Sequence, residues 1–257
     1  MTKGSYYKKF RGQNPGDSEP RLPQVTIDDQ KRKEFEEGKI ILIDKPLHWT
    51  SFDVVRKIRN CIRIKKVGHA GTLDPLASGL LIVCTGKYTK KINSLMAAEK
   101  EYTGEFTLGA VTPTYDLESA PEQHSTIDHI RLEEIQQSAQ TFTGNIMQFP
   151  PIYSAIKKAG VPLYELARRG EDIELQARPV NISVFKITDW NPPHVKFRVV
   201  CSTGTYIRSL ANDLGKSLGC GAYLSSLRRT KVGDYTVNDA QSMEEFVLSL
   251  SEDAQNG

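Results

Sequence analysis

The residues best able to carry chemistry in this chain are a histidine and an aspartate within one glycine-rich stretch. Residues 68–79 read G-H-A-G-T-L-D-P-L-A-S-G and contain His69 and Asp74. A carboxylate can act as a general base or a nucleophile, and an imidazole titrates near neutral pH. The glycines and the proline indicate irregular backbone, and the apolar run 80–84 predicts a buried strand behind it. A loop held against a core strand has the layout of an active site.

Asp74 also has a purely structural interpretation. An aspartate that precedes a proline favours the start of a turn, and its side chain often caps its own backbone there. Spacing alone favours this structural turn over a catalytic carboxylate. Further sequence matches are needed to decide between the two.

The same stretch resembles the signature of the TruB family of tRNA pseudouridine synthases, which is close to G-H-x-G-x-L-D-P-x-A-x-G. The resemblance implies that Asp74 is the catalytic carboxylate in the isomerisation of uridine to pseudouridine. That reaction breaks the C1′–N1 bond, turns the uracil and rejoins it through C5, and the resemblance implies no metal or organic cofactor. It also implies that His69 helps to position the nucleotide and binds it without transferring a proton.

Three weaker matches follow in the order that the family shows. Lys100-Glu101-Tyr102 resembles its K-x-Y motif, residues 204–210 resemble G-T-Y-I-R-x-L, and residues 219–229 resemble G-x-x-A-H-x-x-x-L-R-R, with Tyr223 in place of the histidine. The resemblance implies that these matches and the lysine of G-K-Y-T-K supply the substrate-binding residues, namely Tyr102, Tyr206, Arg208, Leu227 and Lys90.

Two of these residues have a physical reason to be in such a site. The Arg208 guanidinium beside Asp74 would hold that carboxylate ionised and aimed. Tyr102 could stack on the target base, and the resemblance makes it the base for the C5 proton. The competing interpretations are a solvated helix residue for Arg208 and core packing for Tyr102 and Leu227.

The elements that must position these residues follow from hydrophobic periodicity. Val180–Trp190 and Val195–Cys201 predict paired strands, and Thr50 or Ser51 can cap a helix with apolar positions at helical spacing. Strands also are predicted at 39–46, 80–84, 100–109 and 222–235, and helices at 132–142, 205–218 and 243–250. Because strands and helices mix without regular alternation, we expect an α+β fold, with a mixed, largely antiparallel sheet flanked by helices.

The expected domain organisation is simple. Residues 1–33 are polar and predict a disordered, basic arm, and 34–257 predict one catalytic domain. An insertion at about 143–178 resembles the segment that the family folds over the tRNA, with Lys157, Lys158, Arg168 and Arg169 as expected phosphate contacts. About twenty residues follow Tyr235, so we expect no C-terminal PUA domain.

Composition and apolar patterning argue against a zinc-binding, a membrane-spanning and a secreted protein. The chain has 257 residues, a net charge of +3 and four scattered cysteines without a C-x-x-C pair, which predicts reduced core cysteines and no zinc site. The sequence lacks a run of about 18 apolar residues and a secretory signal, so we expect a cytoplasmic protein that does not span a membrane. A mildly basic chain is compatible with a polyanionic partner.

We therefore predict a tRNA pseudouridine synthase that modifies uridine 55 in the TΨC loop, binds the T-arm stem-loop and is a monomer. Two alternatives remain. A tRNA chaperone would open the tRNA elbow and would not need Asp74. A glycoside hydrolase would need a second carboxylate across the scissile bond, and none is evident near the loop.

Overall fold

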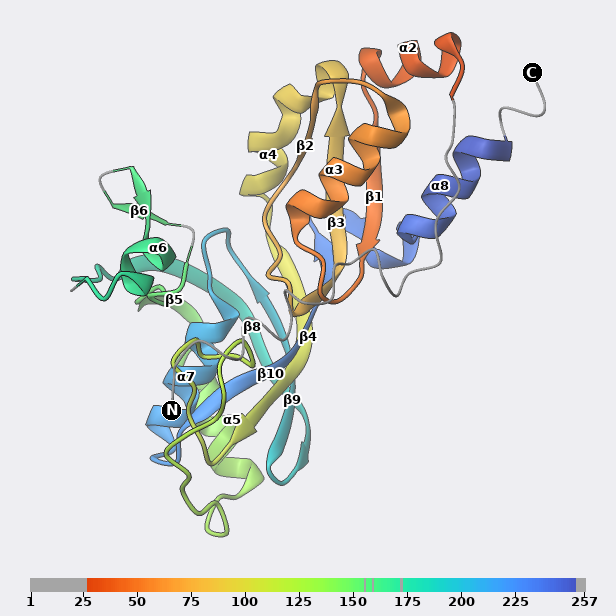
Figure 1. The fold of residues 1–257 in the computed structure, drawn as a ribbon. Helices are drawn as coiled ribbons and strands as arrows, with labels where there is room; N and C mark the ends of the chain where they lie inside the picture. Colours follow the sequence, from red (N-terminus) through yellow and green to blue (C-terminus); the bar gives the residue numbers. More distant parts are fainter. Residues whose placement is uncertain (1–26, 155, 159, 172, 253–257) are drawn as a thin grey trace. The chain divides into compact units, whose positions relative to one another are not determined.

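A computed structural model of the chain describes residues 27–154, 156–158, 160–171 and 173–252 (Figure 1). The chain divides into two compact units. Unit 1 is formed by the described residues within 1–100 and 228–257, and unit 2 by those within 101–227. Within the described residues, none of the helices combines the length and apolar character that crossing a membrane requires.

Unit 1 contains a small antiparallel sheet with helices around it. Strand β1 pairs with β3 from Ile40↔Cys84 to Lys45↔Gly79, and β2 pairs with the C-terminal end of β3, from Val67↔Thr85 to His69↔Val83. Its strands are β1 (Ile40–Lys45), β2 (Val67–His69), β3 (Ala77–Thr85), β11 (Tyr235–Thr236) and the last residues of β10 (Ala222–Val232). Its helices are α2 (Asp29–Glu37), α3 (Ser51–Ile62), η1 (Gly86–Lys91), α4 (Ile92–Ala97), η2 (Val237–Asp239) and α8 (Met243–Glu252).

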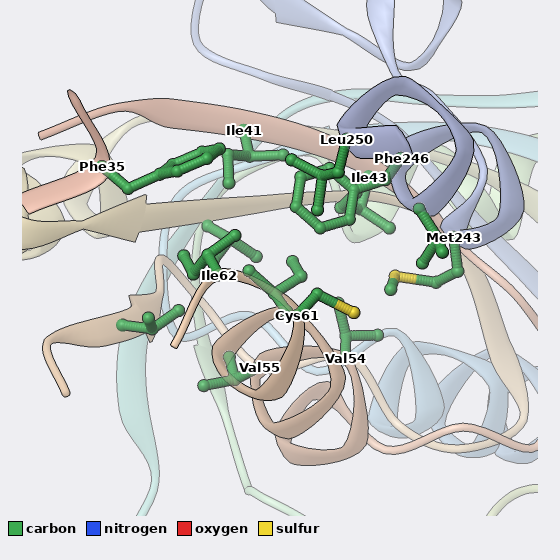
Figure 2. Close-up of a cluster of buried hydrophobic side chains, with 14 of the residues drawn as sticks. Phe35, Ile41, Ile43, Val54, Val55, Cys61, Ile62, Met243, Phe246 and Leu250 are labelled. Carbon is green, nitrogen blue, oxygen red and sulfur yellow. The ribbon is translucent and has the colours of Figure 1, made fainter. Parts of the chain in front are cut away.

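The core of unit 1 forms because apolar side chains recur at helical spacing on α3 and at alternate positions on β1. The Thr50 side chain caps α3 and exchanges capping-box hydrogen bonds with Asp53, as the sequence predicts for Thr50. Figure 2 shows the buried side chains of α2, β1, α3 and α8 pointing toward one another. Those labelled are Phe35, Ile41, Ile43, Val54, Val55, Cys61, Ile62, Met243, Phe246 and Leu250.

Unit 2 is built on sheet strands that follow one another in the order β10-β4-β9-β8-β5. Its core includes Phe106, which stacks on Phe197 at 4.1 Å between ring centroids and meets Phe185 edge-on at 6.2 Å. Its strands are β4 (Lys100–Leu108), β5 (Gly144–Gln148), β6 (Lys157–Lys158), β7 (Val161–Pro162), β8 (Arg178–Asn191), β9 (His194–Cys201) and the first part of β10. Its helices are α5 (Leu132–Thr141), α6 (Leu163–Arg168) and α7 (Ile207–Ser217).

The α+β class expected from the sequence is confirmed, but two boundaries differ. The predicted arm, residues 1–33, extends into α2, which begins at Asp29 because the Asp28 side chain accepts a hydrogen bond from the Lys31 amide. Residues 1–26 lie outside the described residues. The predicted insertion, 143–178, starts too early, because β5 pairs with β8 and is therefore part of the sheet.

Gly79 should be irreplaceable for steric reasons. Its φ is +101°, and a Cβ there would lie 2.3 Å from the Arg229 carbonyl oxygen. We expect Gly79→Ala to lower the free energy of unfolding by more than about 3 kcal/mol, because overlap adds to backbone strain. Gly204→Ala is the matched control, since its φ is +85° but no described atom lies within 4 Å of the added Cβ. It should cost about 1 kcal/mol. Urea unfolding measures both, and equal losses would contradict the steric explanation.

Candidate active site

The loop that carries Asp74 leaves β2 and returns into β3. His69 pairs with Val83, and the next amide, that of Ala70, donates to the Ile82 carbonyl at 2.8 Å. The chain then runs back along β3, and the Ala77 amide closes a turn on the Asp74 carbonyl at 3.0 Å. The half-buried Asp74 therefore lies at the start of β3, next to the fully buried core strand that the sequence predicts.

A buried arginine fixes this loop to the strand. The Arg229 side chain is 1% exposed, its Nε donates to the Leu80 carbonyl at 2.8 Å, and its Nη2 donates to the Gly71 carbonyl at 3.2 Å. Gly71 has φ +101°, a conformation that favours glycine. Because a guanidinium presents several donors in a rigid plane, one side chain holds both the strand and the loop.

The other side of the loop is held by the segment that leads into α3. The buried Ser51 hydroxyl accepts a hydrogen bond from the Leu73 amide at 2.9 Å and donates to the Leu73 carbonyl at 3.2 Å. The His48 amide donates to the Pro75 carbonyl at 2.8 Å. The residues immediately before and after Asp74 are thus both anchored, so the carboxylate has a fixed backbone position.

Two titratable groups near the loop have perturbed pKa values. Lys45 is fully buried, and its Nζ donates to the carbonyls of Pro46 at 2.8 Å and Trp49 at 2.7 Å. Burial lowers the pKa of Lys45 to about 8, and the Asp74 carboxylate opposes this shift. Burial, and then the Arg229 charge, lower the pKa of His69. At neutral pH Lys45 is therefore mostly charged, whereas His69 is mostly neutral.

Unit 2 holds a second group of predicted site residues, centred on Arg208. This buried side chain lies in the first turn of α7, with its Nε 3.5 Å from Asp116 Oδ2. Its Nη1 donates to the Tyr153 carbonyl at 3.2 Å and to the Thr114 carbonyl at 3.3 Å. Burial raises the pKa of Asp116 to about 6, although Arg208 acts against this shift. Arg208 is therefore not the solvated helix residue of the competing interpretation, and its expected pairing with Asp74 stays a prediction.

Tyr206 precedes α7 and is held through its backbone. The Tyr206 amide donates to Gln148 Oε1 at 2.8 Å, and Gln148 Nε2 donates back to the Tyr206 carbonyl at 3.1 Å. One turn on, the Ser209 hydroxyl donates to the Phe149 carbonyl at 2.8 Å. The start of α7 is thereby fixed to the segment that follows β5.

Tyr102 and Leu227 lie on neighbouring strands of unit 2. Tyr102 is buried on β4 and Leu227 is half-buried on β10. The strands are close beside these residues, since a Cβ on Gly104 would lie 2.3 Å from the Ser226 carbonyl. Their proximity is consistent with a shared apolar contact, and equally with core packing.

The structure describes only two of the basic side chains that are expected to bind RNA, those of Lys90 and Arg169. Lys90 is exposed on η1, which follows the end of β3 opposite to Asp74. The nine residues of β3 span roughly 26 Å, so Lys90 does not join the group around Asp74. Arg169 is exposed and lies 3.6 Å from Glu165. The side chains of Lys157, Lys158 and Arg168 lie outside the described part of the structure.

Sequence reasoning missed several residues that hold the site. In the sequence, Lys45 is only a charged residue at the end of an apolar strand. Arg229 belongs to the L-R-R motif, but the motif assigned no role to it. Ser51 was considered as a helix cap, but its hydroxyl binds the Leu73 backbone instead. Asp116 and Gln148 gave no local signal, because their partners lie 92 and 58 residues further along the chain.

Comparison with known proteins identifies the family. Residues 59–207 match the family model described as "TruB family pseudouridylate synthase (N terminal domain)", and residues 208–255 match that of the "tRNA pseudouridylate synthase B C-terminal domain". A relative from Flavobacterium johnsoniae, named tRNA pseudouridine synthase B, is 52% identical and aligns over 85% of this chain and 98% of its own length. One of the same name from Phocaeicola vulgatus is 49% identical over 82% of this chain and 93% of its own.

Solved structures agree with this assignment. A Cbf5-Nop10-Gar1 complex contains a chain that is 28% identical, with a TM-score of 0.66 over 90% of this chain. A structure of an H/ACA RNP bound to a substrate RNA containing 2′-deoxyuridine matches with a TM-score of 0.67 and 26% identity over 94%. The chain spans 60% and 63% of the lengths of these two structural relatives. The chain belongs to the TruB family of pseudouridylate synthases, which confirms the resemblance found in the sequence.

The hydrogen bonds between Ser51 and Leu73 should matter for both stability and activity. We expect Ser51→Ala to lower the free energy of unfolding by about 1–3 kcal/mol, since it leaves a buried amide and carbonyl unsatisfied. It should also reduce kcat, because the backbone next to Asp74 loses an anchor. Ser242→Ala is the matched control, as it removes an exposed hydroxyl that caps the Glu245 amide at 3.1 Å. It should cost about 1 kcal/mol and leave kcat unchanged. An equal fall in kcat for both variants would contradict the anchoring role.

Asp116 should make stability depend on pH. Because its folded-state pKa, about 6, lies above the ordinary aspartate value of 3.8, the folded state binds the proton more tightly. Its contribution to stability therefore rises as pH falls from 7 to 4.5, by about 2 kcal/mol. Asp116→Asn cannot titrate, so the stability of the wild type relative to this variant should rise by this amount as the pH falls over that range. Urea titrations of both proteins at the two pH values measure the difference, and parallel pH profiles would rule the shift out.

Proposed function

We propose that this chain is a tRNA pseudouridine synthase that converts uridine 55 of the T arm to pseudouridine. Membership in the TruB family and the names of the curated relatives support the reaction and the class of substrate. The single observation that carries the proposal is the half-buried Asp74, whose loop is held from two sides by Arg229 and Ser51. Arg229 and Ser51 give the backbone around this carboxylate a fixed position.

Asp74 is the catalytic carboxylate in this proposal. It either attacks C1′ of the ribose or removes a proton from the sugar, and in both cases the C1′–N1 bond breaks. The uracil turns, C5 bonds to C1′, the C5 proton leaves and N1 gains a proton, so that substrate and product are isomers. Preorganised groups lower the barrier most when they need not move during the reaction, and the anchored loop meets that condition.

The remaining predicted residues bind the nucleotide. A buried target base must leave its stack before the enzyme can reach it, and the pocket must then hold it away from water. His69, neutral at pH 7, is suited to a hydrogen bond with the nucleotide, and Tyr102 and Leu227 to contacts with the flat base. Tyr206 and Arg208 contribute from the start of α7.

We further propose that the T-arm stem-loop is sufficient as substrate and that the enzyme acts as a monomer. The insertion between β5 and β8 would contact the RNA backbone through its basic residues, including Arg169. Lys90, which lies on η1, would contact the RNA at a distance from the target nucleotide.

Replacing Asp74 tests the central assignment. We expect Asp74→Asn to lower pseudouridine formation at least about 10⁴-fold, because the amide can act neither as a base nor as an effective nucleophile. Its thermal unfolding and its affinity for a T-arm stem-loop should stay near those of the wild type. Mapping of pseudouridine in the treated RNA provides the measurement.

Asp128→Asn is the control for this experiment, since Asp128 is exposed and the charge change is the same. It should leave the rate unchanged. Substantial product from Asp74→Asn would disprove the catalytic role. If the wild-type chain binds the RNA tightly but yields no pseudouridine, it acts as a tRNA chaperone, and release of free uracil would indicate a glycoside hydrolase.

A further inference from the structure

One buried polar group near Arg208 has no explanation in the fold. Among the described side chains, three buried polar atoms have no hydrogen-bond partner: Arg59 Nε, His69 Nδ1 and Ser154 Oγ. Arg59 still donates from Nη2 to the Val67 carbonyl, and His69 belongs to the Asp74 loop. Ser154 is 3% exposed, and none of the site assignments above uses it.

Ser154 ends a segment that is bound to the start of α7 at three points. Gln148 exchanges two hydrogen bonds with Tyr206, the Phe149 carbonyl accepts one from Ser209, and the Tyr153 carbonyl accepts one from Arg208. The residue before Ser154 therefore contacts a proposed substrate-binding side chain directly. The Ser154 backbone is fixed as well, since its amide donates to the Ile152 carbonyl at 3.0 Å.

An orphaned buried hydroxyl is costly to the folded protein. A hydroxyl that leaves water without finding a partner loses hydrogen bonds that it had in the unfolded chain. Buried polar groups without partners are rare in folded proteins, and each one calls for an explanation, a functional role among them. The rigid segment around Ser154 holds the hydroxyl in place for a partner.

We propose that the Ser154 hydroxyl binds the polar edge of the everted uracil. This inference rests on the proposed function. A buried hydroxyl both donates and accepts, which suits the neutral carbonyl and imide groups of uracil. A backbone phosphate would fit less well, because it would lose its hydration at a buried site where the nearby Arg208 already faces Asp116.

The test is a binding cycle on the complete chain in the Asp74→Asn background, which leaves the RNA unmodified. Two T-arm stem-loops are compared, one with uridine at the target position and one with an abasic nucleotide there. We expect Ser154→Ala to weaken binding of the uridine RNA about tenfold and to leave binding of the abasic RNA unchanged. Ser154→Cys, which is slightly larger and keeps a weak donor, should fall between Ala and wild type. Fluorescence anisotropy gives each Kd.

Thermal unfolding separates binding from a structural role. Ser154→Ala should unfold at the wild-type temperature or above it, because it removes an unsatisfied group. Ser209→Ala is the matched control in the same cluster, and it should unfold at a lower temperature because its hydroxyl is bonded to Phe149. A lower unfolding temperature for Ser154→Ala, or equal losses of affinity for both RNAs, would overturn the proposal.

Failure of this inference can be told apart from failure of the proposed function. If the protein with native Asp74 forms pseudouridine in the uridine RNA and Ser154→Ala binds both RNAs normally, only the role of Ser154 is wrong. If that protein forms no pseudouridine in this RNA, the proposed function is wrong and the inference falls with it.

Discussion

The Arg229 side chain is the constraint on which the candidate active site depends. A guanidinium with almost no solvent contact has lost its hydration, and only well-placed acceptors can compensate for that loss. Here the acceptors are backbone carbonyls, one on β3 and one on the Asp74 loop. Gly71 can turn its carbonyl toward Arg229 because it lacks a Cβ, and Gly79 lets the Arg229 backbone approach β3. The position of Asp74 therefore follows from a residue 155 positions away, and a lysine could not reproduce the two-sided contact.

A similar principle operates around Arg208 in unit 2. Its guanidinium also binds two backbone carbonyls, but it additionally faces Asp116, whose ionisation is opposed by burial. A pair of this kind is costly to build and costlier to break from one side. Such arrangements contribute little net stability, but they fix side chains in one geometry.

Much of the fold could be read from local patterns. The strands β4, β8 and β9 and the helices α3, α5, α7 and α8 follow from apolar periodicity, because burial of one face decides whether each segment is helix or strand, and β3 follows from a continuous apolar run. The two predicted boundaries that were wrong lie in segments without such a pattern. The polar α2 depends on the Asp28 cap and the burial of Phe35, and β5 is an edge strand defined by its pairing with β8. The cap is a local contact, but the burial of Phe35 and the pairing of β5 both involve residues distant in sequence.

By itself the sequence determined the family and the fold class and made Asp74 the candidate for the catalytic carboxylate, because the residues around Asp74 are contiguous and its motif is specific. It could not determine what holds that carboxylate or what surrounds Arg208. Ser51 and Arg229 bind one loop from two segments, and the charge of Asp74 acts on the buried Lys45. Asp116, Gln148 and Tyr153 converge on the start of α7. Burial and hydrogen bonding act through space, so the pKa values of Lys45 and Asp116, and the orphaned hydroxyl of Ser154, exist only once the chain has folded.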